Sequence, residues 1–218
     1  TPELKSTILF NIAIAEKRIS ELTEKNLVKL KNKKVIVYTC NFGSYESVKE
    51  PLFIDSSVEY ILFTDNKDIV STHWQIVVID EQLNDPRRAS RLAKIMPHKY
   101  LPAHDISVYI DSSLELKTCD IRQMIAECME GKDIALYKHY KRNYVYDEIE
   151  FVMKSTDRVV ENKDLCIKAI EKYTAINYPR ENGLFENAFI FRCNTKDIQK
   201  LSELWWQEYI AGTERDQF

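Results

Sequence analysis

The sequence predicts an α/β protein in which a mainly parallel central sheet is covered by helices on both faces. Three observations lead to this fold class. Several short segments are apolar throughout, which is typical of strands in a sheet buried on both faces. Some of these segments end on an aspartate, and segments with helical spacing of apolar residues alternate with them. The 218 residues, 44% hydrophobic and 30% charged, suffice for one large domain with its own core.

The first 34 residues predict a long amphipathic helix that precedes this domain. Its apolar residues recur in steps of three and four, which places them along one helix face. They are Leu4, Ile8, Ile12, Ala15, Ile19 and Leu22. We expect this helix to pack on the domain or to join it to another part of a longer protein, and it offers a surface for forming an oligomer. The domain itself is expected to span residues 35–218.

Strands and helices are expected to follow one another along the rest of the chain. The strands are predicted at residues 35–40, 60–65, 74–80, 106–111, 134–137 and 187–192. The helices are predicted at residues 85–101, 121–129, 165–173 and 196–209. This order predicts a three-layer α/β/α domain.

The composition argues against several common classes of protein. The formal net charge is −3, whereas a domain that binds nucleic acid usually presents a basic face. With 4 glycines in the chain, neither the GxGxxG fingerprint nor the P-loop can be written. The HExxH, CxxC and GxSxG motifs are also absent. The 5 cysteines are odd in number and irregularly spaced, which predicts free thiols.

Membrane and targeting signals give little further information. No apolar run approaches the roughly 20 residues that cross a bilayer, so no transmembrane segment is predicted. We expect a cytoplasmic location, with peripheral attachment to a membrane as the alternative. The chain begins at Thr1 rather than at a methionine and stops at Phe218, so we expect a piece of a longer protein.

Asp111 is the most informative candidate for the functional site. In open α/β sheets, ligands bind outside the carboxyl ends of the strands, and Asp111 directly follows an apolar strand. A carboxylate at that place suits a divalent cation, Mn²⁺ or Mg²⁺, that holds a diphosphate. The usual form of this device is Asp-x-Asp, but here the second position is Ser113. Water, the diphosphate and a side chain such as His139 would have to complete the coordination.

Other polar residues also follow predicted strands or lie on one predicted helix face. Thr39, Asn41 and Asp65 stand at the ends of the first two strands. Arg87, Arg91 and Lys94 share a helix face opposite the apolar side, where they either bind phosphate or form a solvated surface.

The segment 138–148 and the C-terminal region add further candidates. Cations and aromatic residues alternate in 138–148, which is typical of a sugar platform, of a segment that stacks on RNA bases or of a partly exposed loop. Of the two binding functions, the acidic composition favours the sugar. Glu186, next to Asn187, and Asp216, next to Gln217, are carboxylates suited to a general base or to stabilising a glycosyl cation. Either acid is equally well explained as a helix cap.

Several short motifs occur together and in a fixed order. They are residues 38–43 (YTCNFG), 63–65 (FTD), 85–87 (DPR) with Lys94, Pro97 and His98, 109–113 (YIDSS), His139 with Arg142 and 146–148 (YDE), 183–186 (GLFE) and 215–217 (RDQ). Over residues 35–218 this combination resembles a glycosyltransferase-like family of formerly unknown function. That family includes bacterial capsule and surface-polysaccharide proteins and plant mucilage-related proteins.

The resemblance implies a GT-A fold with a nucleotide-diphosphate-sugar site beneath the edge of the sheet. It also implies a degenerate Asp-x-Asp motif at residues 111–113. By similarity to family 8 glycosyltransferases, the pairs Glu186–Asn187 and Asp216–Gln217 would face the donor sugar or the acceptor.

We therefore predict a glycosyltransferase that moves a sugar from a nucleotide donor, a UDP-sugar in the first instance, to a glycan acceptor in capsule or surface-polysaccharide synthesis. The nucleoside would contact Thr39, Asn41 and Asp65, and the phosphates would contact Arg87, Arg91 and Lys94. Further substrate contacts are expected from Ser113, Arg142, Asn187 and Gln217. Asp111 would hold the metal, and His139, Glu186 and Asp216 would surround the transfer.

Two other functions stay open at this point. A catalytically silent nucleotide- or glycan-binding domain of a larger polysaccharide-synthesis protein would also explain the missing second aspartate. A hydrolase acting on a polar lipid or sugar ester is the third reading, although no arrangement of a nucleophile and its base can be seen in the sequence.

Overall fold

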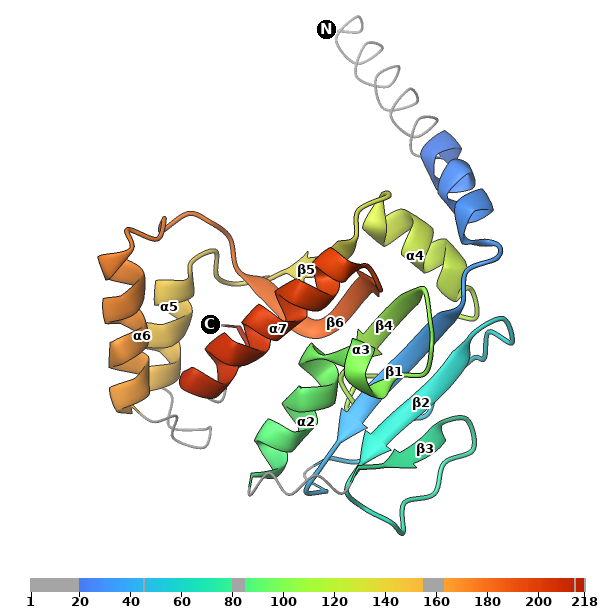
Figure 1. Cartoon of the computed structure of the whole chain (residues 1–218), viewed down its shortest axis with the longest axis horizontal. Helices are drawn as coiled ribbons and strands as arrows, with labels where there is room; N and C mark the ends of the chain where they lie inside the picture. The colour runs from blue at the N-terminus through green and yellow to red at the C-terminus, as the bar shows by residue number, and fades with distance from the viewer. Residues whose placement is uncertain (1–19, 45, 80–84, 155–162, 214, 218) are drawn as a thin grey trace, which may run out of the picture.

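The computed structural model describes residues 20–44, 46–79, 85–154, 163–213 and 215–217 (Figure 1). Its centre is a six-stranded mixed sheet with the strand order β3-β2-β1-β4-β6-β5. Four strands run parallel: β1 (Val35–Asn41), β2 (Glu59–Thr64), β3 (Gln75–Val78) and β4 (Ile106–Ile110). The strand β6 (Phe185–Cys193) lies antiparallel to both β4 and β5 (Ile134–Lys138). The predicted α/β class with a mostly parallel sheet is therefore confirmed.

The side chains of β1 alternate between two cores, one on each face of the sheet. Ile36 and Tyr38 pack with Ala89 and Ala93 of α2 (Pro86–Ile95). Val35 and Val37 instead pack in the core that contains four buried residues of α4 (Ile121–Met129). Both cores form because every residue of β1 is apolar or small enough to be buried, as expected for a central strand.

Helix α7 (Lys196–Ala211) lies on the same face as α2. Tyr209 of α7 packs with Leu92, Ile95 and Met96 at the end of α2, and the two helices run close together in Figure 1. The predicted helix over 85–101 is shorter in the structure: α2 ends at Ile95, and a separate turn, α3 (Pro97–Tyr100), follows. Pro97 explains the break, because proline disfavours a helical conformation in the preceding residue.

Two further helices pack against each other beyond β5 and β6 (Figure 1). They are α5 (Val145–Lys154) and α6 (Lys163–Ala175), and they share a small core around Ile149 and Cys166. The first half of α5 falls in the segment 138–148, which was predicted as a sugar platform or a loop. The loop alternative is wrong for residues 145–148, because Val145, Ile149 and Val152 give this stretch a helical apolar face.

The predicted N-terminal helix is only partly within the described residues. Residues 20–30 are helical, and Leu30 packs in the core beside α4; residues 1–19 lie outside the described part. None of the five cysteines, all of which lie in the described residues, is in a disulfide, as predicted; Cys40 and Cys166 are buried and Cys119 is exposed. Within the described residues, no helix has the length and apolar character needed to cross a membrane.

Candidate functional site

A pocket of about 270 Å³ lies where β4 and β5 end and β6 begins. We call it the charged pocket, because acids and cations from six parts of the chain line it. These residues are Arg91, Lys94, Asp111, His139, Arg142, Glu148, Glu186, Arg215 and Asp216, joined by Tyr140, Asn187, Ala188 and Gln217. The carboxyl ends of β4 and β5 meet here, which is where α/β sheets bind ligands. Most predicted site residues are thus brought together.

Lys94 lies at the floor of the charged pocket and is almost completely buried. Its Nζ is 2.7 Å from Oδ2 of Asp216 and 3.3 Å from Oδ1 of Asp111, and it lies 4.7 Å from the centre of the Tyr109 ring. Arg91, one turn earlier on α2, places Nε 3.1 Å from Oδ2 of Asp216. Two cations from α2 therefore hold two carboxylates from distant parts of the chain.

The burial of Lys94 corrects one prediction about α2. We expected Arg87, Arg91 and Lys94 on a face opposite the apolar side, but the Lys94 side chain is 2% exposed, between the buried residues Ala93 and Ile95. The Lys94 side chain lies against Tyr109 and Asp111 at the end of β4 and against Asp216 of the C-terminal tail. Arg87 is half-buried near the start of α2 and does not line the charged pocket.

Asp216 is ionised over the whole physiological range. Burial by itself would raise the pKa of this carboxyl, but Lys94 and Arg91, with a hydrogen bond from Asn187, lower the pKa to about 2. The tail that carries Asp216 is held in place by Asn187 Nδ2 and Trp205 Nε1, which donate to the Asp216 carbonyl over 2.6 and 3.1 Å. Gln217 donates to the Phe185 carbonyl over 3.2 Å. The predicted pairs Glu186–Asn187 and Asp216–Gln217 thus lie against each other.

The surroundings of Asp111 decide whether a divalent cation fits. Oδ1 of Asp111 accepts a hydrogen bond from the Tyr109 hydroxyl over 2.7 Å, in addition to the contact with Lys94. Burial, with the charge of Asp111 second, raises the pKa of Tyr109 well above its usual value, so the phenol stays a donor. Among the described residues, no group of three or more His, Cys, Asp and Glu side chains is arranged to hold a metal.

The residues around Asp111 therefore do not fit a preformed metal site. His139, which was predicted to complete the coordination, faces Glu186 and Glu148 instead. Ser113 is exposed and does not line the charged pocket. If Mn²⁺ or Mg²⁺ binds at Asp111, most of its ligands have to come from the diphosphate and water.

His139 and Glu186 form a pair on the opposite wall of the charged pocket. Nδ1 of His139 accepts hydrogen bonds from the backbone N–H groups of Lys141 and Arg142, over 3.1 and 3.0 Å. A neutral imidazole has one acceptor nitrogen, so Nε2 carries the proton and points to Oε1 of Glu186, 3.3 Å away. Nη2 of Arg142 also lies 3.3 Å from Nε2. Both atoms carry hydrogens there, so this contact is not a hydrogen bond.

Glu148 is a buried acid for which we predicted no role from the sequence. It is 1% exposed and bonded to the guanidinium groups of Arg142 and Arg215, the latter over 2.7 Å. Glu148 lies on the apolar face of α5, between Val145 and Ile149. An acid on the buried face of an amphipathic helix was the signal that could have identified it. Glu186, whose side chain is 31% exposed, is the carboxylate of this wall that remains open to the pocket.

The predicted nucleoside contacts have different surroundings. Asn41 lines another pocket, of about 310 Å³, and donates to Oγ of Ser112 over 3.3 Å; Ser112 is the neighbour along the chain of Asp111 in the charged pocket. Thr39 is fully buried, on the same face of β1 as Val37, and lines neither pocket.

Asp65 accepts the Gly43 N–H with both oxygens, over 3.1 and 3.0 Å, which holds the turn after β1. Gly43 has φ 69°, a conformation that favours glycine.

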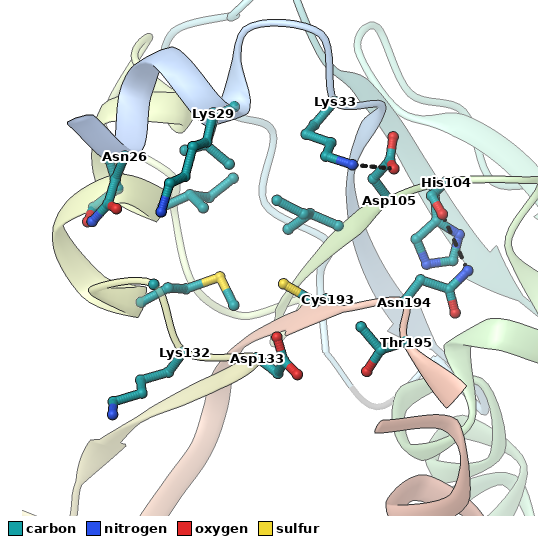
Figure 2. Close-up of a pocket in the computed structure, with 16 residues that line it drawn as sticks. Asn26, Lys29, Lys33, His104, Asp105, Lys132, Asp133, Cys193, Asn194 and Thr195 are labelled. Atoms are coloured by element: carbon teal, nitrogen blue, oxygen red, sulfur yellow. Dashed lines mark hydrogen bonds and ion pairs between the residues drawn. The ribbon is translucent and has the colours of Figure 1, made fainter. Parts of the chain in front are cut away.

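A third pocket lies at the opposite end of the sheet (Figure 2). It has about 320 Å³ between the helical residues 20–30, α4 and the end of β6, and its floor is apolar, with Leu30, Ile106 and Met129. Lys33 and Asp105 form an ion pair of 3.0 Å on its rim (Figure 2). This pocket has the usual apolar character of a ligand site. The charged pocket is the stronger candidate, because it lies at the carboxyl ends of the strands and carries opposed acids and bases.

The fold and the charged pocket together define an α/β domain with a polar pocket, lined by paired carboxylates and cations, at the carboxyl ends of its strands. Residues 11–218 match the family described as TOD1/MUCI70, glycosyltransferase-like domain, and the chain belongs to this family. The predicted resemblance to a glycosyltransferase-like family is confirmed at this level. The match begins before residue 35 and so includes part of the segment that we predicted as a preceding helix.

A curated relative supports the same conclusion. The chain is 24% identical over 225 residues to the probable hexosyltransferase MUCI70 of Arabidopsis thaliana. The alignment covers 90% of this chain and 38% of that protein, so the chain spans well under half the length of this relative. A transferase of the glycosyltransferase type is therefore the class to which the chain is related.

Proposed function

We propose that this domain transfers a hexosyl group from a nucleotide-diphosphate sugar, a UDP-sugar first of all, to a hydroxyl group of a glycan. The observation that supports it most is the charged pocket, in which Glu186 and His139 face a cluster of paired cations and acids. We also propose that the fold is of the GT-A type, with residues 111–113 as a degenerate Asp-x-Asp motif. Synthesis of a capsule or another surface polysaccharide is the process in which such an activity fits.

The proposed division of roles follows from the ionisation and exposure of each carboxylate. Glu186 is partly exposed and can accept the proton of an acceptor hydroxyl, while Nε2–H of His139 holds its other oxygen. Asp216 is a poor base, because its pKa of about 2 lies far below a working pH near neutrality. We therefore assign Asp216 to fixing Arg91 and Lys94, which revises its predicted place among the groups that act on the acceptor.

The cations of the pocket are suited to the charge that develops on the leaving diphosphate. Arg91 is partly exposed, and Arg142 and Arg215 line the same pocket. Fixed cations near a developing negative charge lower the barrier, because they need no reorganisation when the bond breaks. Asn41 lines the neighbouring pocket but is buried, with its amide donating to Glu46 and Ser112, whereas Asp65 is exposed; both are kept as proposed nucleoside contacts.

A catalytically silent binding domain is the second candidate function. The acids Asp111, Glu148 and Asp216 are each paired with a lysine or arginine, and an inert binding site would also show such pairing. A cytoplasmic location, an oligomer through the N-terminal helix and the metal at Asp111 remain predictions of their own.

A donor panel separates the two functions. Thermal stabilisation would be measured with UDP-, GDP-, CDP- and ADP-sugars, because a ligand at a hundred times its Kd adds about 2.7 kcal/mol of stability. Sugar release from the stabilising donor, with water or a glycan as acceptor, would then be followed by chromatography. Stabilisation with turnover supports the transferase, stabilisation without turnover supports the binding domain, and no stabilisation by any nucleotide sugar contradicts the proposed donor.

A further inference from the structure

Arg192 in β6 is an arginine in an unusual environment. It is 1% exposed, and its guanidinium lies 5.3 Å from the centre of the Trp205 ring. Its Nη1 donates to two neutral groups, the Tyr38 hydroxyl over 3.0 Å and the Lys94 carbonyl over 2.9 Å. Within the described residues, its Nε and Nη2 have no hydrogen-bond partner.

The Lys94 carbonyl belongs to the last turn of α2, where helix carbonyls have no partner inside the helix. It accepts hydrogen bonds from Arg192 and also from the Tyr38 hydroxyl, the latter over 2.9 Å. Tyr38 lies in β1 and Arg192 in β6, so two strands of the sheet hold this one backbone group. Burial raises the pKa of Tyr38, which keeps its hydroxyl a donor.

The backbone of Lys94 sets the direction of its side chain. That side chain is 2% exposed, and its ammonium group bridges Asp111 and Asp216. We propose that Arg192 is a positioning residue: it holds the Lys94 carbonyl and thereby keeps the Lys94 ammonium between the two carboxylates of the charged pocket. The inference rests on the proposed function only for its effect on donor binding. Arg192 itself does not line the charged pocket.

A purely structural role for Arg192 predicts that replacing it changes the stability of the fold and nothing else. A buried guanidinium that is bonded only to neutral groups, with two nitrogens unbonded, loses more hydration energy than it regains. The cavity beside it has about 10 Å³, which has room for one water at most and supplies no charge. An apolar side chain of similar length would remove the desolvation penalty. If Arg192 acts by positioning, its replacement shifts the pKa of Asp216 and weakens donor binding, two changes that a purely structural role does not predict.

The test compares Arg192→Met with a matched control, Arg88→Met. Arg88 also donates to a backbone carbonyl, that of Ile210 over 3.0 Å, but it makes no bond to Lys94. The first readout is the midpoint of urea unfolding. The second is the pKa of the Asp216 carboxyl, followed by ¹³C NMR over the pH range in which the protein stays folded. The third is the affinity for the nucleotide sugar that stabilises the unmodified protein most.

We expect Arg192→Met to raise the pKa of Asp216 by about one unit and to weaken donor binding about tenfold. The unfolding midpoint reports the balance between the removed desolvation penalty and the weakened pair between Lys94 and Asp216. Arg88→Met should leave the pKa of Asp216 and donor binding unchanged. Tyr38→Phe removes the other bond to the Lys94 carbonyl and should shift both quantities in the same direction by less, so it keeps the test decisive if Arg192→Met does not fold.

The outcomes separate this inference from the proposed function. If no nucleotide sugar binds the unmodified protein, the proposed donor is wrong, while the titration of Asp216 still reports where the Lys94 ammonium lies. An unchanged pKa of Asp216 in both Arg192→Met and Tyr38→Phe would overturn the inference. So would a loss of stability in Arg192→Met with donor affinity and the pKa of Asp216 unaltered.

Discussion

Nζ of Lys94 lies 2.7 Å from Oδ2 of Asp216, a contact that joins the end of α2 to the C-terminal tail. Both side chains are almost inaccessible, with 2% and 9% of their surface exposed. The tail is fixed at the same point by Asn187 of β6 and Trp205 of α7, which both donate to the Asp216 carbonyl. The floor of the charged pocket is therefore built only when residues 215–217 are docked.

The pair between Lys94 and Asp216 leads to a prediction about stability. Asp216→Asn removes the carboxylate that pairs with both Arg91 and Lys94, and Lys94 keeps its contact with Asp111. Breaking a buried pair by removing one partner destabilises a protein by about 3–5 kcal/mol. We expect a loss at the lower end of this range, measured by urea unfolding at neutral pH. Glu150→Asn on the exposed side of α5 is the control and should change stability by less than about 0.5 kcal/mol. Equal, small effects of both changes would contradict a stabilising pair.

The pKa of Asp216 predicts how stability depends on pH. Its folded value of about 2 lies below the value near 3.9 of an unfolded aspartate. Because the folded pKa is depressed, the contribution of Asp216 is present above about pH 4 and is lost as the pH falls towards 2. Unfolding free energies at pH 3 and pH 6 should therefore differ less in Asp216→Asn than in the unmodified protein. Identical pH dependence in the two proteins would show that Asp216 has an ordinary pKa when folded.

The fold could be predicted because local patterns carry most of the information about single elements. The runs around Val37 and Val108 are rich in β-branched and aromatic residues, and both form central strands. The apolar spacing was a less reliable guide where charged residues or a proline interrupted it. The charges in 138–148 concealed the apolar face of α5, and Pro97 ended α2 earlier than the apolar spacing suggested.

The site could be predicted only as far as neighbours along the chain determine it. Asp111, His139, Glu186 and Asp216 follow or begin strands, or lie in the tail, and the topology brings them to one pocket. The burial of Lys94 could not be predicted, because its neighbours Tyr109, Asp111 and Asp216 come from distant parts of the chain. The burial of Thr39 follows from the alternation of β1, in which Thr39 shares the face of Val35 and Val37. That signal was available in the sequence.

Glu186 is the acid on which the proposed transfer depends most. Glu186→Gln keeps the size of the side chain and a hydrogen-bond acceptor for His139 but removes the base, so we expect the transfer rate to fall about 10²–10⁴-fold. Donor affinity and the unfolding midpoint should stay within about twofold and about 0.5 kcal/mol of the unmodified protein. The rate would be measured as sugar transfer at saturating donor. Full activity of Glu186→Gln would show that Glu186 is not the catalytic base. The contact between His139 and Glu186 would then have no role in catalysis.

Asp111 gives the prediction that bears on the metal. Since the described residues offer no preformed set of metal ligands, Mn²⁺ alone should not raise the melting temperature, whereas Mn²⁺ together with the donor should. Asp111→Asn should abolish this additional stabilisation and the transfer activity. Its fold should stay intact, because Lys94 retains Asp216 and Tyr109 can still donate to the amide oxygen. The same donor panel, run with Mn²⁺ and with EDTA, provides the measurement. If the donor stabilises the unmodified protein equally in EDTA, the metal assignment is removed, and Asp111 is left as a partner that holds the Lys94 ammonium in the pocket.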